Sequence, residues 1–547
     1  MNFTLIPNNV LQPLWYAEVS NAKAAGGATA RPTLIPGQAL GSGYVANIPV
    51  KIMSVGTANT LFRPGSHLAR SIMAYMAGDP NAEIYALPVA DAGGAVPFVL
   101  PLKIVVTGTP GAGVVNLYIA GQRLTIPVTP ASTATSIGDA IVAALGNSES
   151  AAAALGSTFP VFASNATGTV SFTGRNGGTL GNQTDFRVNY LGAAGGEQYP
   201  TGVAVQYNPA GGGWIDLALA YTGSNSTAPA CNAINVGVSG GATLGATDPN
   251  LATAVTNMGD RRYTFVVCPW STKGSGLPVT LLAADFADTL TGRWGPMRKT
   301  YGGVYGARVD TATNLAALAT DNSPHVHIYG IEASPTPPWE LAAEFAAACA
   351  PSIRNDPARP LNTLVLQGAM APAPADQFSW TEREQILANG ITTPIIDSAG
   401  NVRIQRAVST YTKNAYGAAD ASFRDATTTA TLDYMLTEQE NLVTNKYGRT
   451  KLVSNGTPIT PGMAAVTPDA IKNALVAQYM DWERAGLCEN SAVFAKLLTV
   501  TRDTDGNSAG DPTRVNVYFP PDLANGLMVI AALAEYRLQY SPVDLAA

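Results

Sequence analysis

An alternation of helical stripes and short apolar runs between residues 337 and 417 most constrains the fold of this 547-residue chain. It begins with two prolines, which suit the first turn of a helix because proline lacks a backbone N–H. Leu341, Phe345 and Cys349 then recur every fourth residue, which predicts a helix with a buried stripe. Pro351 is expected to end this helix, because proline interrupts the backbone hydrogen-bond ladder.

The second half of this stretch predicts a strand, a helix and a hairpin. The apolar run 361–367 has the length of a buried strand. Thr381 and Glu384 have the spacing of a capping box, and Gly390 is expected to end the helix that they start. Alternating apolar residues in 395–404 flank a polar turn and predict a hairpin. Helices and strands therefore alternate, which predicts an α/β core, and no catalytic constellation falls within the stretch.

The predicted fold class is a multidomain protein of mixed α/β and α+β type. Alternating apolar residues in 97–208, with Asn, Gly and Thr in the turns, predict a mostly antiparallel β domain inserted into the α/β core. The expected parts are an arm at 1–24, a core at 25–96 and 209–410, the inserted domain at 97–208, a C-terminal α+β domain at 411–520 and a second arm at 521–547.

Both ends of the chain are expected to be extended arms. The first has prolines and no helical period, and its aromatic side chains favour docking on another surface over a frayed terminus. Its candidate contact residues are Phe3, Leu5, Trp15 and Tyr16. The last residues alternate apolar side chains, which suits a strand added to a sheet edge, while their Ala and Leu content also suits a short terminal helix. The candidate contact residues there are Tyr536, Leu538 and Tyr540.

Several sequence segments of the chain resemble segments of one protein family. They are FTLIPNNVLQPLWYAEVSNAKA near the start, GDRRYTFVVCPW, GRWGPM, DPARPL, RIQRAVSTYTKNAYG, ADASFRDATTTATLDYM and KYGRTKL. In these words the chain resembles Mu-like contractile phage tail sheath proteins. The resemblance spans nearly the whole chain and is weakest between about residues 97 and 210.

The resemblance implies a structural subunit with neither enzymatic activity nor a cofactor. Its expected partners are other copies of itself in stacked hexameric rings, the tail tube protein, and baseplate and tail terminator proteins. Its expected location is the virion tail, with assembly in the host cytoplasm. Contraction would drive the tube through the host envelope, while the arms exchange strands with neighbouring subunits. The rival hypotheses are a soluble hydrolase with a β accessory domain and a binding protein of the capsid or adhesin type.

A helix predicted at 467–486 is the candidate contact with the tube, because the resemblance places a helix after this Thr-Pro step against the tube. Its expected inward residues are Ile471, Leu475, Gln478 and Trp482, with Tyr479 at their edge. Its expected outward residues are Asp469, Lys472, Asn473, Val476, Met480, Glu483 and Arg484. The alternative is a plain surface helix.

Composition narrows the partners. Charged residues are 13% of the chain, about half the usual share. This favours close packing against other protein copies, or reflects an Ala/Gly/Thr-rich proteome. The net charge of −6 and the lack of Lys/Arg runs argue against nucleic acid. No apolar run reaches the length of a membrane span, so no membrane insertion is expected. The four cysteines lie far apart and are expected to be reduced.

Two motifs are weighed as sites and set aside. His325 and His327 form an HxH pair that suits a metal only with a third ligand, so alternation of a strand on a wet face is preferred. The only other histidine is His67, so Ser–His or Cys–His arrangements for nucleophilic catalysis are scarce. Nothing in the spacing of the carboxylates indicates a paired-carboxylate hydrolase. The glycine-rich segment 108–113 lacks the Lys-Ser/Thr of a phosphate loop and is expected to be a hairpin turn.

Overall fold

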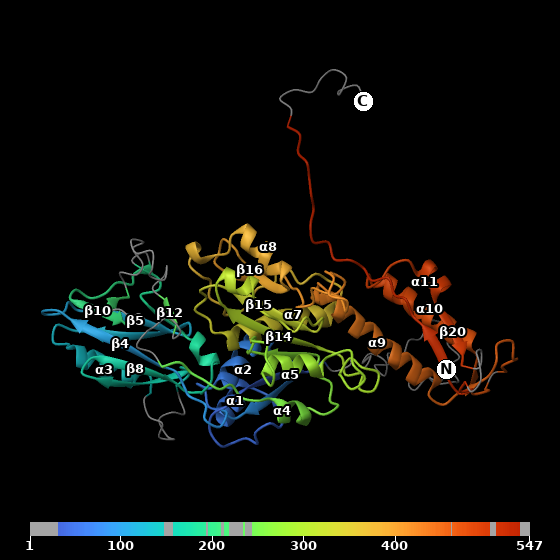
Figure 1. Cartoon of the computed structure of the whole chain (residues 1–547), viewed down its shortest axis with the longest axis horizontal. Coiled ribbons are helices and arrows are strands. Elements are labelled where there is room, and N and C mark those ends of the chain that lie inside the picture. Colours follow the sequence, from blue (N-terminus) through green and yellow to red (C-terminus); the bar gives the residue numbers. More distant parts are fainter. Residues whose placement is uncertain are drawn as a thin grey trace, which may run out of the picture.

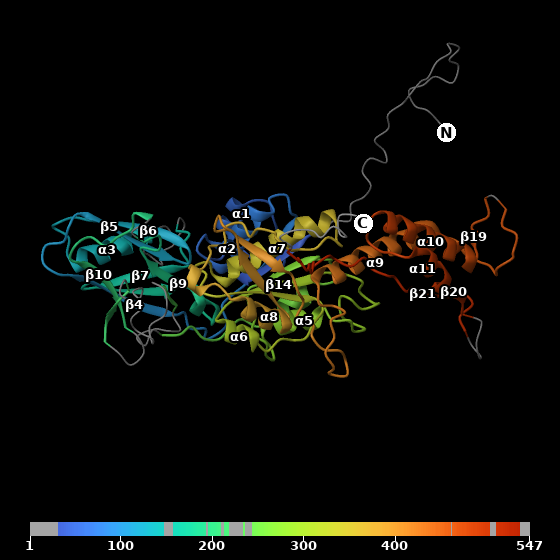
Figure 2. The same cartoon turned by 90° about the horizontal axis from the view of Figure 1, so that it is seen from above.

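The computed structural model describes residues 31–146, 157–192, 195–208, 213–217, 233–235, 243–460, 462–503 and 510–536. Three bodies follow one another along the long axis of the molecule (Figure 1 and Figure 2). A β-rich domain forms one end, an α/β core lies in the middle, and the long helix α9 leads to a small C-terminal domain. The expected arm at 1–24 lies outside the described residues.

The core contains an eight-stranded sheet in the order β17-β16-β15-β14-β13-β1-β3-β2. Its parallel strands are β1 (Thr33–Gln38), β3 (Ile84–Val89), β13 (Phe265–Cys268), β14 (Gly303–Val309), β15 (Val326–Ile331) and β16 (Ile391–Ile396). The two edge strands, β2 (Val50–Ile52) and β17 (Val402–Arg406), run antiparallel to their neighbours. This confirms an α/β core.

Helices cover both faces of this sheet. One face carries α1 (Val55–Phe62), α2 (His67–Gly78) and α7 (Pro338–Asn355). The other carries α4 (Ala252–Asn257), α5 (Pro278–Asp285), α6 (Ala312–Ala316) and α8 (Trp380–Ala388). Successive strand residues alternate between the two cores: Val267 packs on the first and Val266 on the second. Because both faces are buried, the strands are continuous apolar runs.

Three local predictions in the stretch 337–417 were wrong. Pro351 lies inside α7, and the helix continues to Asn355. The capping box is formed by Ser379 and Glu382, two residues earlier than expected, because Ser379 is the residue with extended backbone at the helix start. The run 361–367 is not a strand, since Thr363 has a φ of 63° that breaks the extended conformation.

The run 361–367 instead follows the outer edge of β17 with irregular backbone bonds. The Thr363 amide donates to the Ile404 carbonyl at 2.7 Å, and the Leu366 amide donates to the Val402 carbonyl at 2.9 Å. Leu361 and Leu366 are buried in the first core. The predicted hairpin is confirmed as the antiparallel pair β16–β17, and Gly390 ends α8 with a φ of +78°.

The β-rich domain is built from two antiparallel sheets around one shared apolar core. The first sheet has the order β11-β10-β4-β8-β7, with β4 (Val99–Val106), β7 (Val161–Ala166), β8 (Thr169–Gly174), β10 (Val203–Tyr207) and β11 (Ile215–Asp216). The second has the order β12-β9-β5-β6, with β5 (Gly113–Ile119), β6 (Gln122–Val128), β9 (Asp185–Val188) and β12 (Ala233–Asn235). Helix α3 (Ala134–Ala144) packs against the same core.

Two expectations for this domain differ from the structure. β11 and β12 extend its sheets beyond the expected boundary at residue 208, and bridges join Val96 to Ala246 and Val99 to Thr243. The segment 108–113 is not a hairpin turn, because β4 and β5 belong to different sheets. It is a loop that crosses from one sheet to the other.

The C-terminal domain packs around its own apolar cluster. Its helices are α9 (Ala426–Tyr447), α10 (Pro468–Arg484) and α11 (Ser491–Leu497). Its strand pairs are β18 (Lys451–Leu452) with β19 (Ala465–Val466), and β20 (Thr499–Arg502) with β21 (Val515–Tyr518). The helix predicted at 467–486 is thereby confirmed, and Thr467 caps it through the amide of Ala470 at 3.2 Å.

The sequence predicts an amphipathic helix over 427–445 with Leu432, Leu436 and Val443 inward. Helix α9 confirms the helix, but the expected inward face was wrong. Leu432 and Leu436 are only partly buried, and Val443 is 42% exposed. The buried side chains are Thr427, Thr429, Thr431, Asp433 and Met435. The first half of α9 lies against polar groups of the core, so tertiary contacts rather than its leucines decide which side faces in.

Candidate functional site

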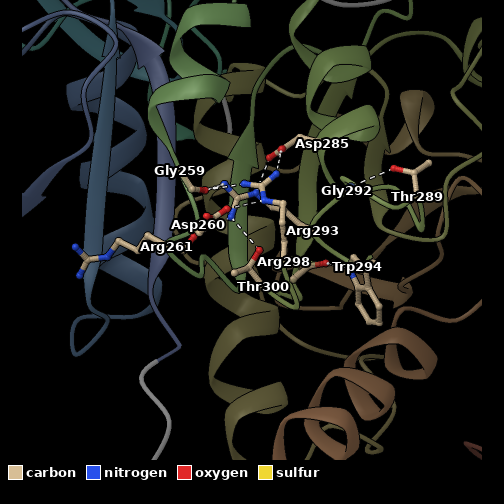
Figure 3. Close-up of polar contacts among 11 residues, drawn as sticks. Gly259, Asp260, Arg261, Asp285, Thr289, Gly292, Arg293, Trp294, Arg298 and Thr300 are labelled. Carbon is tan, nitrogen blue, oxygen red and sulfur yellow. Dashed lines mark hydrogen bonds and ion pairs between the residues drawn. The ribbon is translucent and has the colours of Figure 1, made fainter. Parts of the chain in front are cut away.

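The words GDRRY and GRWGPM meet in an arginine cluster at one end of the core (Figure 3). Arg293 is fully buried, and its Nε donates to Asp285 Oδ2 at 2.5 Å. Its terminal nitrogens donate to the carbonyls of Arg261 at 2.8 Å and Gly259 at 3.0 Å. Arg298 Nη1 lies 2.5 Å from the other oxygen of Asp285. Burial lowers the pKa of Arg293, and the Asp285 carboxylate opposes this. The cluster ties together the two loops that carry these residues.

The same two loops carry the side chains that hold α9 on the core. Arg262 pairs with the buried carboxylate of Asp433 and donates to Thr437 Oγ1 at 2.9 Å. Lys299 Nζ lies 3.0 Å from Glu440 Oε1 at an exposed position. Burial raises the pKa of Asp433, and Arg262 opposes this. The functional consequence of the arginine cluster is therefore positional: it sets where α9 leaves the core.

We call the contact of α9 with the loops that carry Arg262 and Lys299 the α9 joint. Beyond it, an open groove of about 590 Å³ runs between α9, α10 and β21. Its apolar lining includes Tyr301, Leu436, Val443, Val515 and Val517. The last two side chains belong to β21, an outer strand of the pair β20–β21. An apolar groove beside a strand edge is the kind of surface that accepts an added extended segment.

The C-terminal segment leaves the domain after a short anchored stretch. The Ala524 amide donates to the Leu487 carbonyl at 3.1 Å, and Cys488 bridges to Leu523, so the chain is bound up to this point rather than free from 521. From there to residue 536 it has no regular secondary structure and runs away from the body (Figure 1). Its exposed apolar side chains are Leu527, Val529, Ile530, Leu533 and Tyr536, at 69–87%. Leu538 and Tyr540 lie outside the described residues.

Helix α10 presents most of its expected residues as predicted. Leu475, Tyr479 and Trp482 are buried, so Tyr479 belongs to the core and not to its edge. The side chains exposed to solvent include Asp469, Asn473, Met480 and Arg484. Lys472 is partly buried.

Two of the expected outward residues of α10 have structural contacts. Val476 packs partly buried against the apolar cluster of the domain. Glu483 Oε1 accepts a hydrogen bond from the Ser491 amide at 2.9 Å, at the start of α11. Hydrogen bonds with Ser491 lower the pKa of Glu483. Glu483 therefore holds α10 and α11 together, which makes it a poor probe of an external contact.

The two histidines of the HxH pair are buried, which corrects the expectation of a wet strand face. His325 is 2% exposed, stacks on Trp294 at 4.2 Å and lies 3.1 Å from Asp288 Oδ1. His327 is 1% exposed, and its Nδ1 lies 3.3 Å from the Val408 carbonyl. Among the described residues, no group of three His, Cys, Asp or Glu side chains is placed to hold a metal. None of the described helices is long and apolar enough to span a membrane.

Sequence reasoning missed the groove and the joint. The groove combines Tyr301, Leu436 and Val515, which lie far apart in the chain, so no local pattern marks it. The joint had a signal in the sequence, which is the pair of adjacent arginines in GDRRY. Arg262 bonds Asp433 of α9, and the Arg261 carbonyl accepts a hydrogen bond from Arg293. Asp433 gave no matching signal, because it lies off the face that Leu432, Leu436 and Val443 predict to be inward.

Comparison with known proteins identifies the class. A model of the phage tail sheath protein central domain matches residues 245–410, and a model of the phage tail sheath C-terminal domain matches residues 418–537. Together they cover more than half of the chain. The chain belongs to the phage tail sheath family, and it is a structural protein rather than an enzyme.

Within this family the chain is a Mu-like contractile tail sheath protein. It is 29% identical over 542 residues to the Mu-like prophage FluMu tail sheath protein of Haemophilus influenzae, covering 98% of this chain and all of that one. Similar solved structures include sheath tail proteins of Desulfitobacterium hafniense and Listeria innocua, each 12% identical. The first has a TM-score of 0.43 and covers 95% of this chain and 97% of that one. The second has a TM-score of 0.44 and covers 90% and 92%.

Proposed function

We propose that this chain polymerises as stacked hexameric rings around a tail tube and contracts to drive the tube through a host envelope. Its partners are further copies of itself, the tube protein, and the baseplate and terminator proteins, in the tail of a virion that assembles in the host cytoplasm. Membership of the sheath family supports this proposal. A similar structure is the helical sheath of the anti-feeding prophage in its contracted state, 10% identical with a TM-score of 0.41, covering 97% of this chain and 99% of that one.

The observation that carries the proposal is the combination of an exposed apolar tail and an open apolar groove on one chain. The tail from Leu527 to Tyr536 holds several large side chains in water, where exposed apolar area is unfavourable by roughly 25 cal/mol per Å². The groove beside β21 offers both apolar lining and a strand edge. If the tail of one subunit adds as a strand beside β21 of another, its apolar side chains are buried in the groove. Its main chain can then form hydrogen bonds with the strand edge.

The placement of the other parts follows from the same proposal. The β domain, bounded by the bridges at Val96–Ala246 and Val99–Thr243, lies at the far end from the C-terminal domain and faces outward. The exposed stripe of α10, with Asp469, Asn473 and Arg484, faces the tube. The arm at 1–24, with its four candidate contact residues, serves as a second exchanged strand.

The direct test is electron microscopy of purified full-length protein beside a variant lacking residues 529–547. Full-length protein should form tubes or stacked rings. The deletion should melt at the same temperature as wild type, because the described tail packs on little of its own body, yet it should form no tubes. Deletion of residues 1–20 should likewise leave a folded subunit that does not polymerise. Normal tubes from either deletion would contradict strand exchange by that arm.

A matched pair of point variants separates the groove from general surface effects. Val517, on β21 in the groove, is 43% exposed, and Val45, on the core, is 67% exposed. Val517→Arg should abolish tube formation without lowering the melting temperature, because it places a charge where an apolar segment docks. Val45→Arg should leave tubes intact. Equal behaviour of the two variants would remove the groove from the assembly mechanism.

A further inference from the structure

A small cavity lies inside the joint between the core and α9. It has a volume of about 20 Å³ and opens among Thr264 and Phe265 at the start of β13, Gly303 of β14, His327 of β15 and Asp433 of α9. Its other lining residues are Trp294, Gly302, Tyr305, Ile353, Ala426, Thr429 and Ala430. All of its principal polar residues are nearly inaccessible: Thr264 is 4% exposed, His327 1% and Asp433 2%.

The polar atoms around the cavity can form more hydrogen bonds than they form with the protein. Thr264 Oγ1 is buried and has no hydrogen-bond partner among the described protein atoms. His327 Nδ1 faces the Val408 carbonyl at 3.3 Å, so Nδ1 carries the proton and Nε2 is an acceptor. Burial lowers the pKa of His327 to about 4, which keeps the ring neutral. Asp433 uses Oδ1 for Arg262 and Thr437, which leaves its carboxylate able to accept more.

The size of the cavity selects its occupant. A single water needs roughly 10–15 Å³ of such volume and two to four polar partners. The cavity has room for a water, and Thr264, His327 and Asp433 in its lining supply three polar side chains. Gly303 keeps the space open, because a Cβ there would lie 3.3 Å from His327 Nε2.

We propose that the joint holds one structural water, which accepts a hydrogen bond from Thr264 Oγ1 and donates to His327 Nε2 and the Asp433 carboxylate. The water connects β13, β15 and α9, so the long helix rests on the core through a polar, exchangeable contact as well as through side chains. This inference concerns the folded subunit itself and does not depend on how the subunits assemble.

The test uses the full-length chain and a map that resolves ordered water. Wild type should show one density peak in the cavity. Thr264→Val, which removes the hydroxyl at nearly equal volume, should lose that peak and lower the melting temperature by about 2 °C. In a dry cavity the same change removes an unsatisfied buried hydroxyl, so it would leave the melting temperature unchanged or raise it. A wild-type map without the peak, or a Thr264→Val variant at least as stable as wild type, overturns the proposal.

A second pair of variants guards against a packing artefact. Gly303→Ala places a Cβ 3.3 Å from His327 Nε2 without removing a polar group, so it should expel the water and abolish the density peak. Thr429→Val is the matched control, since the Thr429 hydroxyl lines the same cavity but already donates to the Ala426 carbonyl at 3.1 Å. It should keep the density peak. Loss of the peak in Thr429→Val alone, with its retention in Gly303→Ala, would also overturn the assignment.

Discussion

The core is joined to its two neighbours in different ways. At the β domain, Arg70 is 1% exposed and donates to the Thr158 carbonyl at 2.6 Å and to the Ala120 carbonyl at 3.4 Å, while its Nε bonds Glu340 at 2.5 Å. At the C-terminal domain, α9 is held by the Arg262–Asp433 pair and by Lys299–Glu440, whose side chains are 47% and 44% exposed. The first junction is dry and bonds backbone to buried charge. The second combines a largely buried ion pair, an exposed ion pair and a backbone bond from the Ala426 amide to the Ala407 carbonyl at 3.1 Å.

The difference teaches which junction resists displacement. Opening the β-domain junction would leave the buried Arg70 guanidinium without the two carbonyls that accept its hydrogen bonds. Removing the partners of a buried charge is strongly unfavourable. At the α9 junction the buried Asp433 would also lose its partner Arg262, but that guanidinium is already 16% exposed. The second pair, Lys299–Glu440, lies at the surface, where ion pairs contribute little. We therefore expect the β domain to move with the core and the C-terminal domain to be the more easily displaced.

The largest expected effect is at the dry junction. Arg70→Met should destabilise the chain by about 3–5 kcal/mol, because it leaves Glu340 buried without its cation. Chemical denaturation measures the loss. The double variant Arg70→Met/Glu340→Gln should recover part of it, because the unpaired charge is gone. If the single variant is as stable as wild type, the two junctions do not differ in the way described.

Two histidines report on the two junctions separately through pH. His67 stacks on Trp339 at 4.2 Å, and its amide donates to Asn176 of the β domain at 3.2 Å, while His327 lines the α9 joint. Burial lowers the pKa of His67 to about 3 and that of His327 to about 4, from an unfolded value of 6.5. The unfolded chain therefore binds protons that the native chain does not, and stability is lost as pH falls below 6.5. Each histidine contributes at most about 1.4 kcal/mol per pH unit.

The measurement compares wild type with His67→Gln and with His327→Gln between pH 7.5 and 4.5. The advantage of wild type over each variant should shrink as pH falls. The difference in the free energy of unfolding between wild type and variant removes the contribution of carboxyl groups that both proteins share. One such group is Glu344, whose pKa is raised by burial. Hydrogen exchange should localise the acid loosening to the β-domain junction for His67 and to α9 for His327. A pH-independent difference for either variant would mean that its histidine takes up protons at the same pH in the native and the unfolded chain.

At the α9 junction a smaller effect is expected. Asp433→Asn should cost about 1–3 kcal/mol, because Arg262 loses its charge partner while a polar group of the same shape remains. The loss should appear as faster hydrogen exchange in α9 and the C-terminal domain, with the core sheet unchanged. Glu440→Gln is the matched control at the exposed pair and should leave exchange unaltered. Uniform loosening of the core in Asp433→Asn would contradict a separable joint.

The smallest effect on folding concerns the outward stripe of α10. The described ion pair of Arg484 is with the exposed Asp481, so Arg484→Glu should change folding stability by less than about 1 kcal/mol, as should Lys472→Glu. Both should weaken assembly on the tube when the tube protein is co-expressed, because a small loss repeats in every copy. Trp482→Ala is the folding control: it removes a buried ring and should cost about 3–5 kcal/mol. Unchanged sheath on the tube in both charge variants would make α10 a plain surface helix.

Local patterns predicted the elements better than the contacts between them. The apolar run 84–89 predicts a strand, and β3 occupies these same residues, because a run buried on both faces of a sheet can be recognised without knowing its partners. The inward face of α9 was not predictable in this way. Its buried threonines and Asp433 are polar residues that become core only because Arg262, some 170 positions earlier, meets them. Arg70 and Glu340 are separated by 270 positions, and neither carries a local signal of burial.

The two edges of the core sheet limit how copies of the chain can pair with one another. One edge, β2, is only three residues long, and the other, β17, already bonds to the run 361–367. Sheet edges that are short or covered resist pairing with a neighbouring copy, which is how β proteins avoid aggregation. At the high local concentrations in which identical chains accumulate, the core therefore offers little unpaired edge for misassociation. A neighbouring copy would then meet the core mainly through side chains, and such contacts can be exchanged without unravelling a strand.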